Sequence, residues 1–458
     1  MKVGLFIFPV RFSEIPPIDI AYLSAYLKKA GHQVYIRDFN SELSVDNSND
    51  SGFWIGKDNQ KELFEKNTSR VSGWVKDILD FSADVVGFSV YYEQIFFALE
   101  IAKMIKAKNE NTRIVFGGSI CAFLRRGREL ITYKQVDYVV AGEGEATLRE
   151  IVESKDYTKP IKGCLSKHNG EILDGGYREE INNIDDLPFP DYTELKFSNY
   201  IRPTTYPISF TRGCTWRCSF CTAPLVWKKF RARSAGNVFS EIKHCLSSYP
   251  FIKDFYVCDH SMNAQIPLIS ELSELIIKNN INIDGFIGYG QVNSRMTDKT
   301  LLKKLKRAGF SCWGIGIQSG SDHVLKSMKR LHTAEEAEKL LKAMSSIGMN
   351  VSIDFIIGYP EERDVDFLKT LNFITRVKKY LTDISVTSCG IGNNDIQFNP
   401  SKYGIIAIND FDNAWASIHS TPAIRAERHK IFVEHLNNSG FKSVKPGANH
   451  FILENSRH

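Results

Sequence analysis

Two series of short apolar runs that alternate with helical patterns constrain this chain more than any other feature of its sequence. Five strands are predicted in the first series, at residues 3–8, 34–37, 85–90, 114–116 and 136–140. Strands separated by helices predict a parallel sheet with helices on both faces. We therefore expect residues 1–150 to form an open, doubly wound α/β sheet, which binds ligands at the carboxyl ends of its strands.

A second series begins near residue 205 and continues to about residue 395. Its strands are predicted at residues 208–211, 254–257, 286–289, 313–317, 351–356 and 383–387. Six successive βα units predict a partial (β/α)6 barrel, with chemistry at the C-terminal ends of the strands. Residues 151–204 contain several prolines and little periodicity, so they are predicted to form a linker. Residues 396–458 lose the alternation and are predicted to form a small C-terminal cap that can face a substrate.

Composition argues against several classes of protein. No apolar run in the 458 residues is long enough to span a bilayer, and a net charge of +5 gives no case for a nucleic-acid or membrane partner. The N-terminus, MKVGLFIFPVRF, lacks the apolar length and cleavage site of a signal peptide and is predicted to be a strand. Nine cysteines, mostly single, do not indicate a disulfide framework. We therefore expect a cytoplasmic protein in a reducing compartment.

Three cysteines are clustered in the stretch FTRGCTWRCSFC, directly after the first strand of the second series. Cys214, Cys218 and Cys221 lie within eight residues in a Cys-x3-Cys-x2-Cys pattern. Three thiolates this close can ligate three irons of a cubane cluster and leave the fourth iron open to a small molecule. Structural zinc is the competing reading, but it requires four ligands and no second pair follows. Three unrelated loop cysteines are the remaining alternative.

This triplet, with Phe220 before its last cysteine, resembles the radical SAM superfamily. The resemblance implies a [4Fe–4S] cluster whose open iron is chelated by S-adenosylmethionine (SAM). It also implies that one electron from the reduced cluster cleaves SAM to a 5′-deoxyadenosyl radical, which abstracts hydrogen from a substrate. The protein then supplies positioning and exclusion of water.

Later segments resemble the same family in the same strand order. FRARSAGNVFSEI resembles the segment that follows the cysteine loop. One interpretation is structural, with Ser234 as a helix N-cap. The alternative is a functional role for Arg231 or Arg233. FYVCDHSMN matches the first acid of the second-strand motif but has His260 for the second. GIGIQSGSDHVLKSMKR has glutamine where the fourth-strand motif usually has glutamate, and DFIIGYPEER resembles the fifth-strand motif beside adenine. The SAM contacts implied by these matches are Phe220, Asp259, Gln291, Gln318, Ser319 and Gly358.

The first series resembles the Rossmann-like cobalamin-binding domain that precedes the barrel in one radical SAM class. The segments that carry this resemblance are PPIDIAYLSAYLKKAGHQV, GFSVYY, FGGS and VDYVVAGEGEATL. The implied cobalamin contacts are Pro17, Ser89, Tyr91, Gly117, Gly118, Gly142, Glu143 and Gly144. A generic nucleotide-binding sheet is the alternative, although GxGxxG is missing after the first strand. Asp-x-His-x-x-Gly is also missing, so no histidine is expected below the cobalt.

The resemblance predicts a cobalamin-dependent radical SAM methyltransferase that acts on an unactivated carbon of a small molecule or natural-product precursor. A rearrangement, ring contraction or cyclisation without methyl transfer uses the same cofactors and remains open. A hypothesis of another class is an iron–sulfur electron-transfer or binding module. A reducing partner such as flavodoxin or ferredoxin is expected. The substrate is not visible, although Asn393, Asn394, Tyr403, Trp415 and His419 can line a site, and the two aromatic residues are expected to pack instead.

Overall fold

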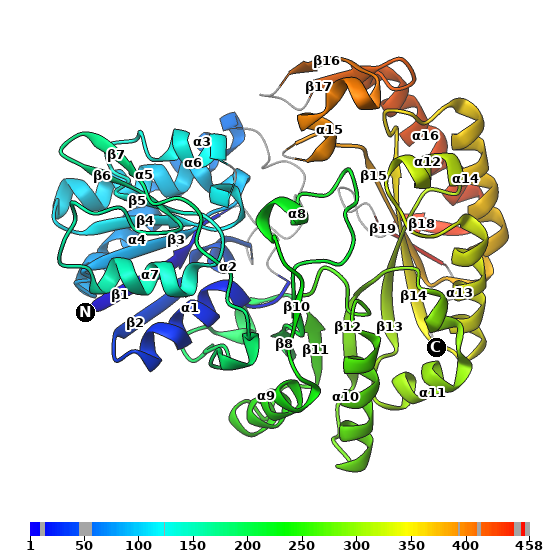
Figure 1. The fold of residues 1–458 in the computed structure, drawn as a ribbon, viewed down its shortest axis with the longest axis horizontal. Helices are drawn as coiled ribbons and strands as arrows, with labels where there is room; N and C mark the ends of the chain where they lie inside the picture. Colours follow the sequence, from blue (N-terminus) through cyan, green and yellow to red (C-terminus); the bar gives the residue numbers. More distant parts are fainter. Residues whose placement is uncertain are drawn as a thin grey trace. The chain divides into compact units, whose positions relative to one another are not determined.

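The computed structural model describes residues 1–9, 14–44, 57–122, 124–392, 394–409, 414–443 and 450–453. The chain divides into two compact units, Met1–Pro207 and Ile208–His458 (Figure 1). None of the helices within the described residues has the length and apolar character that crossing a membrane requires.

The first unit contains a seven-stranded sheet with the order β2-β1-β3-β4-β5-β6-β7. Its parallel strands are β1 (Lys2–Ile7), β2 (Gln33–Asp38), β3 (Val85–Ser89), β4 (Arg113–Gly117) and β5 (Tyr138–Val140). The order 2-1-3-4-5 reverses direction between β1 and β3, which is where doubly wound sheets bind ligands. The predicted doubly wound α/β sheet is confirmed.

Helices cover this sheet because each parallel crossover must return along one of its faces. They are α1 (Ile18–Lys29), α2 (Phe39–Ser44), α3 (Lys57–Lys66), α4 (Thr68–Asp80), α5 (Ile95–Lys108), α6 (Leu124–Leu130) and α7 (Gly144–Glu153). Trp74 of α4 and Phe97 of α5 join Phe6, Phe88 and Phe116 of the strands in one buried core. Helices α1 and α7 contact each other outside that core.

The predicted linker, residues 151–204, belongs instead to the first compact unit and extends its sheet. It contributes the antiparallel strands β6 (Cys164–His168) and β7 (Glu171–Asp174). Asn169 and Gly170 join them with φ values of 51° and 84°, the left-handed pair of a tight hairpin turn. Farther along, the buried Tyr200 donates a hydrogen bond to Asp38 at 3.1 Å, which attaches the segment to β2.

The second unit contains an eight-stranded sheet with the order β18-β19-β15-β14-β13-β12-β11-β8. Six strands correspond to the predicted partial barrel: β8 (Thr205–Ile208), β11 (Asp254–Val257), β12 (Gly285–Gly290), β13 (Cys312–Gln318), β14 (Asn350–Ile357) and β15 (Asp383–Ser388). Between them run α9 (Ala235–Ser248), α10 (Ile266–Lys278), α11 (Lys299–Arg307), α12 (Asp322–Ser327), α13 (Ala334–Ser346) and α14 (Asp364–Val377). Strands β11 to β15 pair in parallel, so their carboxyl ends meet at one edge.

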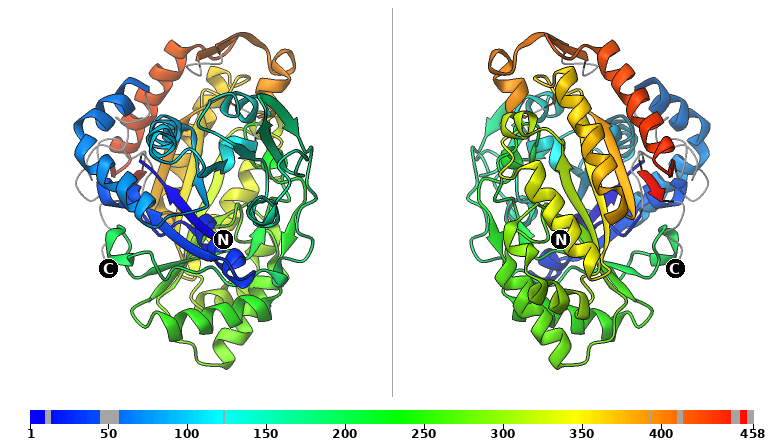
Figure 2. Two further views of the ribbon diagram at one scale, coloured as in Figure 1. Left: turned by 90° about the vertical axis from the view of Figure 1, so that its left-hand side faces the viewer. Right: turned by 90° about the vertical axis from the view of Figure 1, so that its right-hand side faces the viewer.

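The C-terminal segment is joined to this sheet rather than separate from it. Strands β18 (Phe441–Ser443) and β19 (His450–Leu453) add to β15 in antiparallel pairing. Helix α16 (Pro422–Asn438) lies beside α14, and its Phe432 ring is 5.6 Å from that of Phe355 on β14 (Figure 2).

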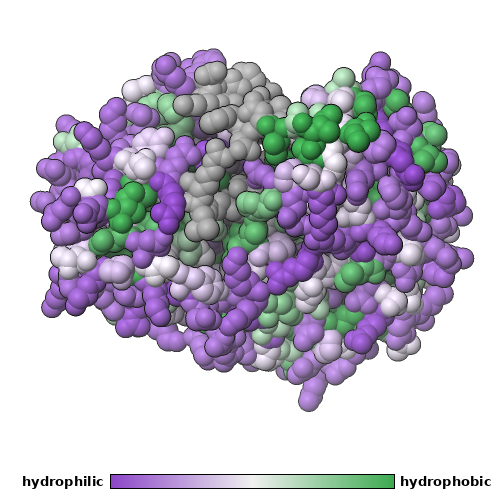
Figure 3. All heavy atoms as spheres, turned by 45° about the horizontal axis from the view of Figure 1, so that its top comes forward, coloured by the Kyte–Doolittle hydropathy of each residue, from purple (hydrophilic) through white to green (hydrophobic). Residues whose placement is uncertain are grey.

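A short hairpin precedes α16. It consists of β16 (Ile405–Asn409) and β17 (Ala414–Ser417) and follows the short helix α15 (Asp395–Phe398). Apolar side chains gather on this part of the surface (Figure 3), where Phe398, Ile406 and Ile418 are exposed.

Candidate functional site

The cysteine triplet lies on a loop, residues 213–221, that we name the cluster loop. It leaves the short strand β9 (Thr211–Arg212), which pairs antiparallel with β10 (Arg231–Ala232), and it ends before α8 (Ala223–Val226). Gly213 begins the loop with φ +83°, and a Cβ atom there would lie 2.5 Å from the carbonyl oxygen of Lys229. Only glycine fits such a position, so the entry to the loop is fixed by backbone contact.

Each cysteine sulfur accepts a hydrogen bond from nitrogen. The donors are the backbone N–H of Trp216 to Cys214 at 3.4 Å and that of Ala223 to Cys221 at 3.4 Å. The guanidinium of Arg330 donates to Cys218 at 3.3 Å. Burial raises the pKa of the Cys214 and Cys221 thiols, whereas these backbone donors and the charge of Arg330 oppose that rise. The loop therefore presents three sulfurs that each accept one N–H hydrogen bond, and the buried setting raises the pKa of two of the thiols.

These thiols suit a cubane better than a single metal ion. Across the described ranges, no three His, Cys, Asp or Glu side chains converge closely enough to hold one ion. A [4Fe–4S] cluster needs each thiolate on a different iron, so its ligands stand apart around a cube. The three sulfurs nevertheless influence one another electrostatically. Structural zinc would also need a fourth ligand, which the triplet itself does not supply.

Arg330 is a central side chain that the sequence reasoning missed. It follows α12 and lies 112 positions after Cys218. Its guanidinium is buried, stacks over the Trp216 ring at 4.6 Å and donates to the carbonyl oxygen of Gly316. Stacked, desolvated arginines interact strongly with anionic groups. Arg330 thus links the cluster loop to β13.

Three polar side chains, those of Gln291, Gln318 and Arg330, gather around Gly316 near the carboxyl end of β13, and we name this group the polar recess. A Cβ atom built there would lie 2.7 Å from Gln318 Nε2, 3.6 Å from Arg330 Nη2 and 3.9 Å from Gln291 Oε1. Gln291 Oε1 is buried and has no hydrogen-bond partner among the described residues. Since a buried acceptor without a donor is costly, a donor-bearing ligand such as the amino group or ribose hydroxyls of SAM fits this recess.

Gln318 and Ser319 form the strand end beside the recess, but they differ in availability. Gln318 has φ +75°, a conformation rare outside glycine, and the β13–β14 register shifts at this point. Backbone strain of this kind is often found at functional sites. Ser319 is fully buried, and its hydroxyl lies 3.2 Å from that of Thr370 on α14. The Gln318 side chain makes no hydrogen bond with the described residues, whereas the Ser319 hydroxyl is paired with Thr370 of α14.

In the first unit, the residues predicted to contact cobalamin gather at one edge of the sheet. Pro17 precedes α1, Ser89 ends β3, Gly117 ends β4 and Gly142 follows β5. Ser89 Oγ lies 2.5 Å from Asp19 Oδ2. Tyr91 begins the turn after β3, where its backbone N–H donates to Gln94. The parallel strands alone bring these positions together.

The glycines of this edge have different surroundings. Gly118 has φ +96°, and a Cβ atom there would lie 2.7 Å from both the nitrogen and the oxygen of Val90. Among the described residues, no atom lies within 4 Å of such a Cβ at Gly142, which has φ +89°, and at Gly117 only the carbonyl oxygen of Phe88 does, at 4.0 Å. Gly117 and Gly142 thus leave open space above the backbone, which suits a broad, flat ligand.

The two acidic residues at the same edge, Glu143 and Asp19, differ in their hydrogen bonding. Glu143 precedes α7 and accepts the backbone N–H of Ile181 at 2.6 Å. Gly144 follows it and lies against Leu23 of α1, 3.1 Å from its would-be Cβ. Asp19 Oδ1, by contrast, is buried with no hydrogen-bond partner in the described part of the chain. An unpaired acceptor beside open glycines fits the amide donors of a corrin ring, and Asp19 was not predicted.

Comparison with known proteins decides the family. Residues 208–374 match the Radical SAM superfamily, and residues 6–152 match the B12 binding domain. This chain belongs to the cobalamin-binding class of the radical SAM superfamily. The two matches imply a [4Fe–4S] cluster, SAM and cobalamin as its cofactors. They also decide against the generic nucleotide-binding sheet.

Individual relatives of this radical SAM protein are distant. An uncharacterised methyltransferase of Pyrococcus horikoshii is 26% identical over 372 residues, which are 79% of this chain and 73% of the relative. The fold is similar to that of the cobalamin-dependent SAM radical enzyme OxsB, with a TM-score of 0.74, 19% identity and coverage of 96% of this chain and 67% of OxsB. It is also similar to that of the radical SAM methyltransferase TsrM of Kitasatospora setae, with a TM-score of 0.67, 16% identity and coverage of 96% and 89%.

Two predicted SAM contacts of this radical SAM protein have internal partners. Asp259 is buried and accepts from Phe210 N–H at 2.8 Å and from Thr211 Oγ1 at 2.7 Å, so it braces the strand before the cluster loop. Burial raises its pKa to about 6. Gly358 donates its N–H to Glu362 at 2.7 Å and accepts from Ser420 at 2.6 Å. Direct SAM contacts by Asp259 and Gly358 stay predictions.

Phe220 and the aromatic residues of the predicted cap pack in one core. Phe220 is partly buried against a core that contains Tyr403 and Trp415, and its carbonyl oxygen accepts from Asn394 at 3.1 Å. The expected packing of the two aromatic side chains is confirmed by their burial. Asn393 lies outside the described residues. The predicted substrate-facing role of residues 396–458 stays a prediction.

Proposed function

We propose that this protein is a cobalamin-dependent radical SAM methyltransferase that methylates an unactivated carbon of a small molecule or natural-product precursor. The observation that carries the proposal is the presence of both sites on one chain. A cysteine triplet lies beside a polar recess in the second unit, and a glycine-lined sheet edge occurs in the first. The methyltransferase relative from Pyrococcus horikoshii and the fold shared with TsrM support methyl transfer over other outcomes.

When bound, the cluster and SAM supply radical chemistry, and cobalamin supplies a carrier for a methyl group. The chain's own residues position these groups. Cys214, Cys218 and Cys221 would ligate the cluster, while Arg330 donates to the Cys218 sulfur. Gln291 and Gln318 offer an acceptor and a donor to SAM. Arg330 also stacks on the Trp216 ring of the cluster loop at 4.6 Å, which would help to exclude water near the Cys218 sulfur.

At the first sheet, open glycines allow close approach of the corrin, and Asp19 offers it an acceptor. We propose that Pro17, Ser89, Tyr91, Gly117, Gly118, Gly142, Glu143 and Gly144 line this site as predicted. Among them, Gly117 and Gly142 leave space for direct contact with the corrin. Gly118 instead allows the close approach of its own backbone to that of Val90. An external reductant such as flavodoxin or ferredoxin would deliver the electron to the cluster.

Two SAM-derived products distinguish the reaction classes. Anaerobically purified protein with reconstituted cluster would be mixed with SAM, a reductant and candidate substrates. Methyl transfer predicts both S-adenosylhomocysteine and 5′-deoxyadenosine, together with a product heavier by one CH2 unit. The absorption spectrum of the same sample shows whether cobalamin accompanies the cluster. A product of unchanged mass without S-adenosylhomocysteine would contradict methyl transfer.

A rearrangement without methyl transfer is the second candidate. It is compatible with the fold shared with OxsB, a cobalamin-dependent S-adenosylmethionine radical enzyme. It predicts 5′-deoxyadenosine or reused SAM and an isomeric or oxidised product. An electron-transfer module is a weaker third candidate, because it has no use for a polar recess beside its cluster. Absence of 5′-deoxyadenosine with every candidate substrate would favour it.

A further inference from the structure

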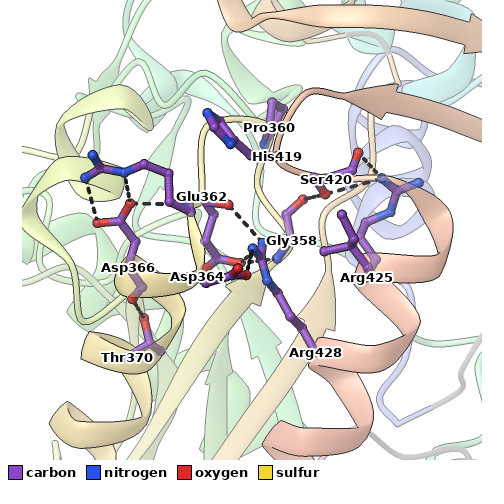
Figure 4. A network of polar contacts seen from close by, with 12 residues as sticks. Gly358, Pro360, Glu362, Asp364, Asp366, Thr370, His419, Ser420, Arg425 and Arg428 are labelled. Atoms are coloured by element: carbon purple, nitrogen blue, oxygen red, sulfur yellow. Dashed lines mark hydrogen bonds and ion pairs between the residues drawn. The ribbon is translucent and has the colours of Figure 1, made fainter.

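The turn at the end of β14, residues 358–362, which we name the Gly358 turn, receives its hydrogen bonds from a distant part of the chain. Ser420 Oγ donates to the carbonyl oxygen of Gly358 at 2.6 Å, and Ser417 Oγ donates to that of Pro360 at 2.6 Å. Both serines precede α16, about 60 residues later in sequence. Figure 4 shows this network around the turn.

A buried ion pair completes the turn. Glu362 accepts the Gly358 N–H at 2.7 Å and contacts Arg428 of α16 at 3.1 Å. Their side chains are 0% and 5% exposed. Arg428 also donates to the carbonyl oxygen of Glu362 at 2.9 Å and to Asp364 at 2.8 Å. Burial raises the pKa of Glu362 to about 7, and the charge of Arg428 opposes that rise.

Arg425 closes the turn by packing rather than by charge. A Cβ atom on Gly358 would lie 2.4 Å from Arg425 Cγ and 3.3 Å from Ser420 Oγ, and Gly358 has φ +70°. The Arg425 guanidinium lies 3.8 Å from the centre of the Trp415 ring and donates to the Trp415 carbonyl oxygen at 2.9 Å. Residues 415–428, which we name the bracing segment, therefore fill the space beside Gly358 that a larger side chain would need.

Stability alone is a poor explanation for this arrangement. A buried ion pair often stabilises a fold no better than apolar residues of the same volume, and its best-attested use is to select one arrangement. Here the selected arrangement is a left-handed glycine followed by a tight turn. Asn394 makes a parallel link, because it donates to the carbonyl oxygen of Phe220 on the cluster loop.

We propose that the bracing segment sets the conformation of the Gly358 turn for SAM binding, with Ser420 and Arg428 as positioning residues. The proposal rests on the proposed function and on the resemblance of DFIIGYPEER, which contains this turn, to the strand motif beside the adenine of SAM. It gives residues after 396 a role in cofactor binding. It also explains why the polar groups of Gly358 are used internally, so that the turn offers SAM a shaped surface instead of hydrogen bonds.

The test compares SAM affinity in five variants of the full, cluster-loaded protein, measured by equilibrium dialysis without reductant. Ser420→Ala removes one hydrogen bond and should raise the Kd about fivefold. Arg428→Met leaves Glu362 buried without its partner and should raise the Kd about tenfold or more. Arg428→Lys keeps the positive charge but loses the planar guanidinium that donates to several acceptors at once. Its Kd should therefore lie between those of the unmodified protein and Arg428→Met. Arg376→Met is the matched control, because Arg376 pairs with Glu338 on an exposed surface of the same unit, and its Kd should not change.

A rescue variant separates positioning from general damage. Glu362→Gln combined with Arg428→Met keeps an oxygen acceptor for the Gly358 N–H and needs no counter-charge. It should recover most of the SAM affinity lost in Arg428→Met. Iron and sulfide content, measured alongside, should match the unmodified protein in all variants.

Several outcomes overturn the proposal. It is wrong if Ser420→Ala and Arg428→Met bind SAM as tightly as the unmodified protein, or if Arg376→Met weakens binding equally. It is also wrong if the rescue variant binds no better than Arg428→Met. If Arg428→Met fails to fold, Ser420→Ala decides alone. Failure of the unmodified protein to bind SAM would refute the proposed function instead, so the two failures are distinguishable.

Discussion

The two sheet edges of this protein differ in the groups that they offer to a ligand. The edge of the first sheet offers glycine backbone, and few or no atoms of the described residues lie within 4 Å of a Cβ built at Gly117 or Gly142. The edge of the second sheet offers side chains, Gln291, Gln318 and Arg330, around a recess, and the neighbouring Gly358 turn is fixed by a buried ion pair. A broad, nearly rigid ligand needs shape and close approach, whereas a small charged one needs placed donors and acceptors. Glycine backbone at the first edge is therefore suited to cobalamin, and polar side chains at the second edge are suited to the cluster and SAM.

Replacing all three cluster cysteines by alanine should separate the two edges most completely. The variant should contain no cluster and form no 5′-deoxyadenosine, because its thiolate ligands are gone. Cobalamin content should stay near that of the unmodified protein, since the first unit has its own core. Iron, sulfide and product analysis check the first claim, and the absorption spectrum checks the second. Cys312→Ala, a partly buried cysteine outside the triplet, is the control. Continued 5′-deoxyadenosine formation by the triple variant would refute the central claim.

Gly118→Ala should damage the first edge more than Gly142→Ala. At Gly118 a Cβ meets the Val90 backbone at 2.7 Å in addition to the positive φ, whereas at Gly142 only the φ is unfavourable. We expect a loss of about 3 kcal/mol in unfolding free energy for Gly118→Ala and about 1 kcal/mol for Gly142→Ala. Thermal unfolding and cobalamin content measure both. Equal losses would show that close packing does not distinguish these glycines.

Arg330→Met should lower the reduction potential of the cluster. The positive guanidinium at 3.3 Å from the Cys218 sulfur favours the more negative, reduced state. Loss of one charge-assisted hydrogen bond corresponds to about 60 mV for a one-electron couple. A redox titration followed by electron paramagnetic resonance measures the shift. Arg217→Met, an exposed arginine of the same loop, should shift the potential less. An upward shift, or equal shifts in both variants, would be inconsistent with this role.

The smallest expected effect concerns pH and Asp259. Its pKa in the folded protein, about 6, lies above the ordinary value of 3.8, so the folded state takes up a proton that the unfolded state does not between these values. Asp259 therefore adds stability as the pH falls through 6, and this contribution is lost as the pH rises. The stability advantage of the unmodified protein over Asp259→Asn should grow by about 1 kcal/mol from pH 7 to pH 5. Thermal unfolding at both pH values tests this, and a pH-independent difference would contradict it.

Local sequence was sufficient for features whose atoms lie close together along the chain. Cys214, Cys218 and Cys221 fall within one loop, so their spacing alone indicates a cluster. The strand–helix alternation likewise predicted both parallel sheets, because each period reflects one buried face. The Asn169–Gly170 hairpin was also readable from its turn residues, but it was missed because the prolines around it favoured a linker. The prediction therefore assigned its two strands to a linker, whereas the structure places them in the first unit.

Tertiary structure alone decided which side chains stand beside these local features. Arg330 reaches Cys218 across 112 positions, and Arg428 reaches Glu362 across 66. Asp259, predicted to contact SAM, is hydrogen-bonded to the strand before the cluster loop, and Asp19 Oδ1 at the first sheet edge has no hydrogen-bond partner among the described residues. None of these partnerships leaves a periodic or spaced signal in a single sequence, because burial and hydrogen bonding depend on which segments meet after folding. The chain's own pattern determined the two sheets and the cysteine triplet, whereas the packing of distant segments determined the polar surroundings in which the cofactors would be bound.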